Sequence, residues 1–297
     1  MVRIVAAGHV NWDVTLRVDA LPEPDGEARI QSQQTSGGGS AANVAAALAG
    51  FGESVGLVGS VGDDEHGHLA RRELEALDVD LAHLLTVPGV ATTVKYLIVA
   101  ADGEVMVLGN DGANERVAPG DVDSDYIADA EHLHLTSQRP DTAARLAEVA
   151  ADAGVSVSFD PGRRLLDHDY SATLDRTDVV FLNDREARAI LDDAYEYAGS
   201  ALDDRILVVK HGDEGAEVHT PDGSYEHPGF DIDPLDSTGA GDAFAAGFIR
   251  VYLDAGDVEL ALEVANACGA LTTQGEGARC APTGDELDAF LAAQFSE

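Results

Sequence analysis

The chain has 297 residues and a formal net charge of −37, from 55 acidic and 18 basic residues. Such an acidic excess excludes nucleic acid as a partner, because binding to a phosphate backbone needs a basic surface, and no run of 18 apolar residues predicts a membrane span. Aliphatic residues recur at helix and strand periods along the whole chain, so we predict a folded protein with an acidic surface rather than a disordered one.

The composition also bears on the cellular setting. It resembles that of cytoplasmic proteins from halophilic organisms, in which molar salt screens the self-repulsion of an acidic surface. The first residues, 2–8, are too quickly polar for a signal peptide and predict a buried strand. Cys268 and Cys280 have no metal-ligand spacing, which favours a reducing interior. We therefore expect a cytoplasmic protein.

Apolar strand patterns alternate with helical patterns along the chain, which predicts a mostly parallel sheet flanked by helices. The predicted core strands are 4–8, 55–58, 132–136, 155–160, 179–182 and 206–210. The predicted helices are 42–50, 67–77, 142–153, 186–191, 241–253, 260–272 and 286–295. The alternation predicts a single α/β domain.

Two segments interrupt this alternation. Residues 14–18 and 27–30 alternate apolar and polar side chains around a turn, and 93–99 meets 104–108 across Asp102-Gly103, a strong hairpin signal. We therefore predict a small antiparallel sheet beside the main domain. The predicted division assigns 1–10, 34–90 and 105–297 to the α/β core, and 11–33 and 91–104 to the small sheet.

A first glycine-rich segment, 36–45, reads Ser-Gly-Gly-Gly-Ser-Ala-Ala-Asn-Val-Ala. Backbone without side chains lets a polyhydroxylated ring approach closely, and Asn43 offers both a donor and an acceptor. The same stretch fits the dinucleotide fingerprint, with Asp63 following at the expected distance. That fingerprint must follow a hydrophobic strand, however, whereas residues 31–36 are polar, which argues against a nicotinamide enzyme.

The second glycine-rich segment, 236–242, reads Asp-Ser-Thr-Gly-Ala-Gly-Asp and leads directly into an amphipathic helix. Glycine backbones at a helix N-terminus can direct their N–H groups at one point, where the helix dipole also favours an anion. Asp242, in the first turn, is placed to accept a proton from an attacking hydroxyl. This combination suits phosphoryl transfer to an alcohol, and the alternative is a plain glycine-rich turn with an Asp at its helix N-terminus.

Together the two segments resemble the two signatures of the ribokinase (PfkB) family of carbohydrate and nucleoside kinases. The resemblance implies a ribokinase-like fold in which the small sheet is a lid over the sugar and a possible homodimer surface. It implies ATP and Mg²⁺ as cofactors, Asp242 as the catalytic base, and the amides of Gly239, Ala240 and Gly241 as the anion hole. Asp236 matches the family's monovalent-cation site, so K⁺ is a further expected cofactor.

Other positions match the family's binding elements. By this resemblance Asn11 and Asp13 form the N-terminal sugar-binding pair, joined by Gly38, Gly39 and Asn43. A second group is expected on the nucleotide: Asn183, Glu186, Lys210, Gly212, Gly215 and Asn266. Glu186 would also place Mg²⁺ through water, although Asn183 and Glu186 equally fit a helix capping box.

The acceptor cannot be read from these motifs. Residues 160–164, Asp-Pro-Gly-Arg-Arg, resemble the D-P-N-x-R element of some sugar kinases, but Gly162 stands where those carry Asn. Arg163 or Arg139 could bind a carboxylate or phosphate on the substrate. We expect an ATP-dependent kinase acting on a hydroxyl of a small sugar or sugar derivative; the alternatives are a nucleoside kinase of the same fold and a non-catalytic sugar or nucleotide sensor. The absence of G-x-x-x-x-G-K-[ST] argues against a P-loop enzyme.

Overall fold

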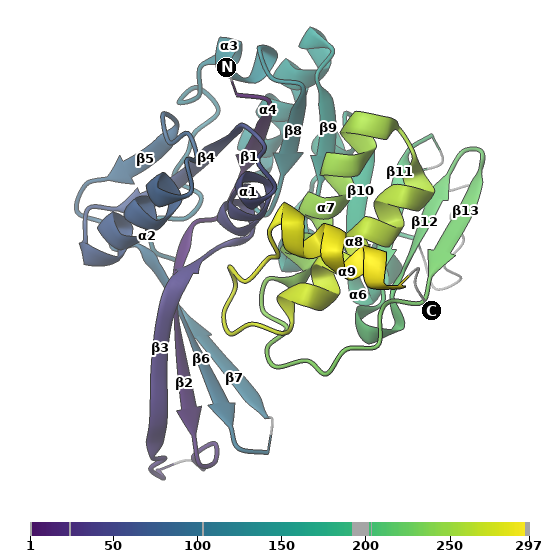
Figure 1. The fold of residues 1–297 in the computed structure, drawn as a ribbon. Helices are drawn as coiled ribbons and strands as arrows, with labels where there is room; N and C mark the ends of the chain where they lie inside the picture. Colours follow the sequence, from purple (N-terminus) through teal and green to yellow (C-terminus); the bar gives the residue numbers. More distant parts are fainter. Residues whose placement is uncertain (1, 24, 103, 192–201, 203, 295–297) are drawn as a thin grey trace.

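The computed structural model describes every residue except 1, 24, 103, 192–201, 203 and 295–297. Within the described residues, the main sheet has nine strands in the order β13-β12-β11-β10-β9-β8-β1-β4-β5 (Figure 1). Their bounds are β1 (Ile4–Ala7), β4 (Val55–Gly62), β5 (Leu84–Val87), β8 (His132–Leu135), β9 (Ser156–Phe159), β10 (Val179–Asn183), β11 (Ile206–Lys210), β12 (Ala216–Thr220) and β13 (Gly223–His227).

The sheet is parallel from β5 to β11, and the edge strands β12 and β13 pair antiparallel. Strand β1 lies between β4 and β8 and is fully buried, as expected for a central strand covered on both faces. All six core strands predicted from the sequence are present, which confirms the predicted fold class.

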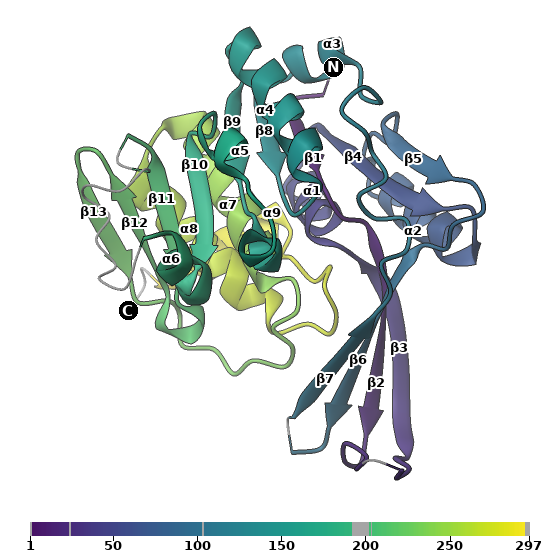
Figure 2. The same ribbon diagram turned by 180° about the vertical axis from the view of Figure 1, so that it is seen from behind.

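Helices cover both faces of this sheet. One face carries α1 (Ser40–Gly50), α2 (Glu65–Ala76), α7 (Ala240–Ala255), α8 (Val258–Thr272) and α9 (Gly284–Gln294), and the opposite face carries α3 (Ser124–Ala128), α4 (Pro140–Ala153), α5 (Ser171–Leu174) and α6 (Asp184–Ile190) (Figures 1 and 2). Each of the seven predicted helices corresponds closely to one of these, except that Phe295 lies outside the described residues, whereas the short helices α3 and α5 were not predicted. No described helix combines the length and the apolarity that crossing a membrane requires.

Small side chains let the helices pack tightly on one another. A β-carbon at Gly247 of α7 would lie 2.6 Å from Cys268 Sγ of α8, so this glycine permits the close approach of the two helices. Helix α1 contributes a run of buried alanines to the same core cluster. These contacts hold the N-terminus of α7, which carries the second glycine-rich segment, against the sheet.

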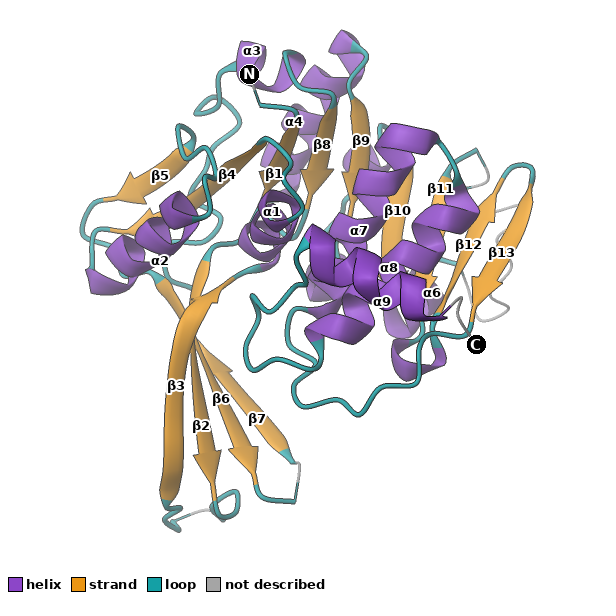
Figure 3. Cartoon of the chain, viewed as in Figure 1, coloured by secondary structure: helices purple, strands orange, loops and turns teal. Residues whose placement is uncertain are grey.

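A second sheet projects away from the core (Figure 3). It contains β2 (Asn11–Val18), β3 (Ile30–Gly38), β6 (Thr93–Ala100) and β7 (Val105–Gly109) in the order β3-β2-β6-β7, and we call it the lid sheet. The pairs β2–β3 and β6–β7 are antiparallel as predicted, whereas the central pair β2–β6 is parallel. Gly103, in the predicted hairpin turn, lies outside the described residues.

The lid sheet is larger than the predicted ranges 11–33 and 91–104. Strand β3 continues to Gly38 and β7 begins at Val105, so both reach into segments that the sequence assigned to the core. Periodicity shows that a segment is a strand, but only the pairing of distant strands decides which sheet it joins.

Candidate active site

A cavity of about 1010 Å³ lies between the carboxyl ends of the parallel strands and one face of the lid sheet. Ligands of open parallel sheets bind at this edge, because the loops that follow the strands converge there. Eleven of the predicted site residues line the cavity: Asp13, Gly39, Asn43, Arg163, Asn183, Glu186, Lys210, Asp236, Gly239, Gly241 and Asp242. The structure therefore brings both glycine-rich segments to one site.

Asp242 and Asn43 meet in this cavity although 199 residues separate them. The Asn43 amide Nδ2 donates to Asp242 Oδ2 at 2.8 Å. Burial raises the pKa of Asp242 to about 6, and the hydrogen bond from Asn43 opposes part of that rise. A carboxylate that ionises near pH 6 is a stronger base than an exposed aspartate and is still ionised at neutral pH.

The second glycine-rich segment forms the N-terminus of α7. Gly239 is left-handed, with φ of 81°, and a β-carbon there would lie 2.2 Å from the Ala278 carbonyl oxygen, so only glycine fits. Ala240 donates its amide to the Ser237 carbonyl at 3.2 Å. The amides of Gly241 and Asp242 lie in the first turn, which has no upstream helical acceptors. They are the donors best placed to hold an anion.

Asp236 ties this turn to the segment that follows α8. Its Oδ1 accepts from the Thr238 amide at 2.9 Å, and its Oδ2 accepts from the Gly277 amide at 3.0 Å. Burial would raise the pKa of Asp236, but these hydrogen bonds hold it below its usual value. The carboxylate is therefore ionised and lines the cavity.

Several buried polar atoms on the lid side of the cavity have no hydrogen-bond partner among the described residues. These atoms are Asp13 Oδ1, Asn43 Oδ1 and Asn11 Nδ2. Burial raises the pKa of Asp13 to about 6, against the opposing charges of Lys95 and Arg279. Unsatisfied buried donors and acceptors are costly, so their convergence is typical of a site built for a ligand with several hydroxyl groups.

Gly38 makes room for Asp13. A β-carbon at Gly38 would lie 2.1 Å from Asp13 Oδ2, so a side chain there would displace the carboxylate. Gly39 has a φ of 94° and precedes α1, and its missing side chain allows close approach to the His9 carbonyl. The glycines of the first segment thus set the positions of Asp13 and Asn43.

The other side of the cavity carries a charged cluster at the ends of β9, β10 and β11. Lys210 Nζ pairs with Asp160 Oδ2 at 2.7 Å. Burial would lower the pKa of Lys210, but Asp160, Glu186 and Asp242 together raise it, so the ammonium stays charged. Lys210 Nζ would lie 3.5 Å from a β-carbon placed on Gly241, so the ammonium group is next to the N-terminus of α7.

Asn183 and Glu186 form the capping box that the sequence predicted as one of two interpretations. Asn183 Oδ1 accepts from the Glu186 amide, and Glu186 Oε2 accepts from the Asn183 amide, both at 3.0 Å. Burial and the neighbouring Asp160 raise the pKa of Glu186. No group of three or more His, Cys, Asp or Glu side chains in the described part of the chain forms a cage for a metal. Glu186 still lines the cavity and can accept from metal-bound water.

Seven residues that the sequence analysis named as candidates do not line the cavity. Asn11 is fully buried and its Oδ1 accepts from Asn114 at 2.6 Å. Gly38 makes room for Asp13, and the Ala240 amide donates to the Ser237 carbonyl. Gly212 and Gly215 shape the β11–β12 turn, where a β-carbon on Gly215 would meet the His227 carbonyl at 2.0 Å. Asn266 donates to the Leu262 carbonyl within α8. Arg139 pairs with Asp141 on the surface.

Several cavity residues were missed by the sequence reasoning. They are Lys95 on β6, Arg17 on β2, and Asn110, Asp111 and Asn114 after β7. Lys95 carried one available signal, since the chain has only two lysines. The loop residues carried none, because their approach to the cavity depends on how β7 pairs with β6.

The fold and this cavity define a sugar kinase of the ribokinase type. The model of the pfkB family of carbohydrate kinases matches residues 1–284, and the chain belongs to that family. It is a phosphotransferase with an alcohol group as acceptor and uses ATP, which sets aside the alternative of a non-catalytic sensor.

Among the proteins similar to it, an ATP-dependent ribose-1-phosphate kinase from Halopiger xanaduensis is 65% identical over 99% of this chain and 100% of its own length. A nucleoside kinase from Methanothermobacter thermautotrophicus is 28% identical over 97% of this chain and 96% of its own.

Solved structures support the same fold. The ribokinase of Arabidopsis thaliana, complexed with ribose and ATP, superposes with a TM-score of 0.86 at 24% identity and covers 98% of this chain and 99% of its own. The nucleoside kinase of Methanocaldococcus jannaschii gives a TM-score of 0.85 at 24% identity, with 99% of each chain covered. At this identity the likeness establishes the fold alone.

Proposed function

We propose that this protein is an ATP-dependent ribose-1-phosphate kinase that transfers the γ-phosphoryl group to a free hydroxyl of the sugar phosphate. The observation that carries the proposal is the 65% identity, over essentially both whole chains, to the Halopiger xanaduensis enzyme of that activity. The cavity supports it, because one side offers unpaired polar atoms for hydroxyl groups and both sides carry cations for phosphate.

Asp242 is the proposed general base. Its pKa of about 6 and its place in the first turn of α7 suit proton removal from the attacking hydroxyl, and Asn43 fixes the carboxylate through the 2.8 Å hydrogen bond. The amides of Gly239, Ala240, Gly241 and Asp242 are the predicted anion hole, of which Gly241 and Asp242 are the best-placed donors. They would stabilise the charge that develops on the phosphoryl group.

The acceptor sugar would be held on the lid side. Asp13 Oδ1, Asn43 Oδ1 and the backbone at Gly38 and Gly39 offer acceptors and close approach for its hydroxyl groups, while Asn11 orients Asn114 beneath them. Arg163 lines the cavity as a further candidate for the substrate anion. A site that hydrogen-bonds hydroxyl groups in this way discriminates strongly against analogues that lack them.

The nucleotide would be held at the carboxyl ends of β10 and β11. Lys210 is the proposed contact to phosphate, and Asn183 and Glu186 face the same part of the cavity. The predicted nucleotide-binding residues also include Gly212, Gly215 and Asn266. These three do not line the cavity and would act through the shape of the backbone. Bound Mg²⁺ would neutralise phosphate charge, with Glu186 accepting from its water ligands.

Asp236 is the proposed site for a monovalent cation, with K⁺ the expected ion. Its carboxylate is ionised and lines the cavity beside the anion hole. Exchange of KCl for an equal concentration of tetramethylammonium chloride should then lower kcat without unfolding the protein. Unchanged turnover in the two salts would remove K⁺ from the proposal.

We further propose a homodimer that forms through the outer face of the lid sheet. Tyr96, Met106 and Leu108 expose 42%, 37% and 51% of their surface there, on the face opposite Asp13 and Lys95. An apolar row on a sheet face favours a second copy as its cover. Light scattering of the Leu108→Glu variant should then show a monomer where the native protein is a dimer.

The use of ATP also favours a cytoplasmic location.

The test is an acceptor panel in high salt with ATP and Mg²⁺, containing ribose 1-phosphate, ribose, fructose, a keto sugar acid and several nucleosides. We expect the highest kcat/KM with ribose 1-phosphate and a bisphosphorylated product. The nucleoside kinase from Methanothermobacter thermautotrophicus makes a nucleoside the second candidate. Preference for a nucleoside would establish that candidate and overturn ribose 1-phosphate.

A further inference from the structure

The positive charges of this chain are distributed unevenly. Acidic residues outnumber basic ones by 55 to 18, and only two of the basic residues are lysines. Both lysines, Lys95 and Lys210, line the cavity, together with Arg17, Arg163 and Arg164. In so acidic a protein, a cation at the wall of the site is strongly attracted to neighbouring carboxylates, so a cation that has no carboxylate partner there keeps its full hydrogen-bonding capacity for a ligand.

Three of these five cations already have a carboxylate partner. Lys210 pairs with Asp160 at 2.7 Å, while Arg17 pairs with Glu276 and Arg164 with Glu115, both at 3.1 Å. The other two cations, Lys95 and Arg163, have no carboxylate oxygen within 4 Å in the part of the chain that the structure describes, and of these two it is Lys95 that stands directly beside Asp13. Lys95 therefore faces the cavity with its hydrogen-bonding capacity unused.

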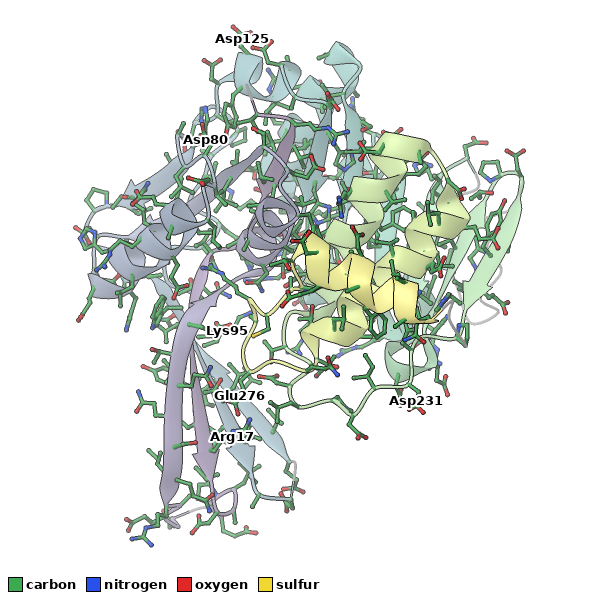
Figure 4. The ribbon with its side chains drawn as sticks, in the orientation of Figure 1. Arg17, Asp80, Lys95, Asp125, Asp231 and Glu276 are labelled. Carbon is green, nitrogen blue, oxygen red and sulfur yellow. The ribbon has the colours of Figure 1, made fainter. Side chains whose placement is uncertain are left out.

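Strand pairing fixes the position of Lys95. Strands β2 and β6 are parallel and in register, with Lys95 directly beside Asp13. Partner residues of adjacent strands point to the same face, so the lysine and the aspartate share the inner face of the lid sheet. Lys95 is labelled in Figure 4, at the base of the lid sheet where it joins the core.

The electrostatic influence of Lys95 places it on the acceptor side. Its charge opposes the rise in the pKa of Asp13 and of Asp242, the two carboxylates assigned to sugar binding and to proton removal. Lys210 also opposes the rise in the pKa of Asp242, but it lies among Asp160, Glu186 and the N-terminus of α7, whereas Lys95 stands beside Asp13. The two lysines thus lie on opposite sides of the cavity, Lys95 on the side assigned to the acceptor and Lys210 on the side assigned to the donor phosphates.

We propose that Lys95 binds the phosphate group carried by the acceptor and is the residue that selects a sugar phosphate over a neutral sugar. This inference rests on the proposed function, since it names the group that recognises the anionic part of that substrate. Asp13 would hold ring hydroxyls while the neighbouring ammonium pairs with the phosphate oxygens. An unpaired lysine in a half-buried position gains a charge-assisted hydrogen bond when the phosphate arrives.

The experiment compares Lys95→Met and Lys95→Arg with the native enzyme in high salt. We measure kcat and KM for ribose 1-phosphate, for ribose as the matched neutral acceptor, for a keto sugar acid, and for ATP. Arg72→Met, on the exposed surface of α2 and outside the cavity, controls for the loss of one positive charge. Circular dichroism and thermal melting confirm that each variant is folded.

Lys95→Met should raise KM for ribose 1-phosphate by about 10- to 100-fold, the range expected for a hydrogen bond to a charged group. It should leave KM for ATP and kcat/KM for ribose within threefold, and Lys95→Arg should recover most of the loss. An equal loss with ribose would overturn the proposal, as would a rise confined to the KM for ATP. A loss confined to the keto sugar acid would assign Lys95 to a carboxylate instead and would also overturn it.

The same measurements separate this inference from the proposed function. If the native enzyme does not phosphorylate ribose 1-phosphate, the proposed function fails before any variant is compared. If the native enzyme does so and Lys95→Met retains its KM for that substrate, the proposed function stands and the inference about Lys95 fails.

Discussion

Replacement of Asp242 by asparagine should lower activity and raise stability at the same time. Burial raises the pKa of this carboxyl from 3.8 to about 6 in the folded protein. Between these two values the folded state binds more protons than the unfolded state, so stability falls as the pH rises. Above pH 6 the penalty is complete and, at 1.36 kcal/mol per pKa unit, amounts to up to about 3 kcal/mol.

Asparagine removes this penalty without changing the shape of the side chain, and its carbonyl oxygen can still accept from Asn43. At pH 7 the variant should therefore be more stable than the native protein by up to about 3 kcal/mol, and the difference should vanish below about pH 4. Without a general base, kcat should fall by roughly 10²- to 10⁴-fold.

The assay is denaturant unfolding in high salt at pH 4, 5, 6 and 7, paired with coupled-enzyme turnover at pH 7. Asp231→Asn is the matched control, because Asp231 is an exposed carboxylate on the segment that precedes α7 (Figure 4). A kcat within tenfold of the native value would refute the role as base. A stability difference that does not change between pH 4 and 7 would refute the argument from burial.

Three further predictions concern the same site and the core behind it. Asn43→Ala should raise the pKa of Asp242, because it removes the hydrogen bond that Asn43 donates to this carboxylate. The acid limb of the pH profile of kcat/KM should then move upward by about 0.7 pH units, the equivalent of one hydrogen bond of roughly 1 kcal/mol. An acid limb that does not move would contradict this prediction. Gly239→Ala should destabilise the fold by at least about 2 kcal/mol in denaturant unfolding, because Gly239 has a φ of 81° and a β-carbon there would clash with the Ala278 carbonyl oxygen. Gly241→Ala should change stability by less than about 0.5 kcal/mol. Equal effects of the two substitutions would refute the steric argument. Burial lowers the pKa of His134 to about 3, so this residue contributes stability that is complete above pH 6.5 and is lost as the pH falls toward 3. His134→Leu should therefore reduce the slope of the unfolding free energy against pH by about 1.4 kcal/mol per pH unit between pH 6 and 4. Parallel curves for the two proteins would show that His134 is not the source of this pH dependence.

The sequence by itself indicated the reaction, because the two glycine-rich segments are local structures that carry the resemblance to the ribokinase (PfkB) family. A turn of glycines at a helix N-terminus makes an anion site wherever the helix lies, and Asp242 belongs to that same turn. Hydrophobic periodicity likewise determined the strands and helices of the core, since both periods depend only on neighbouring residues. The capping box of Asn183 and Glu186 is local too, and it was found as one of two interpretations.

The tertiary structure alone decided which side chains meet. The hydrogen bond between Asn43 and Asp242 and the ion pair between Lys210 and Asp160 join residues that are distant in sequence. Asn266 matched a sequence pattern, yet its amide turns to its own helix rather than to the cavity. Local pattern cannot predict these outcomes, because they depend on how α7 and the strands are packed.

Lys95 illustrates the physical reason most directly. Its side chain would point to the opposite face if β6 were shifted by one residue against β2, and the sequence of either strand alone does not fix that register. The scarcity of lysine in the sequence marked the residue as unusual. Only the pairing of two strands some 80 residues apart in the chain placed it beside Asp13 at the mouth of the site.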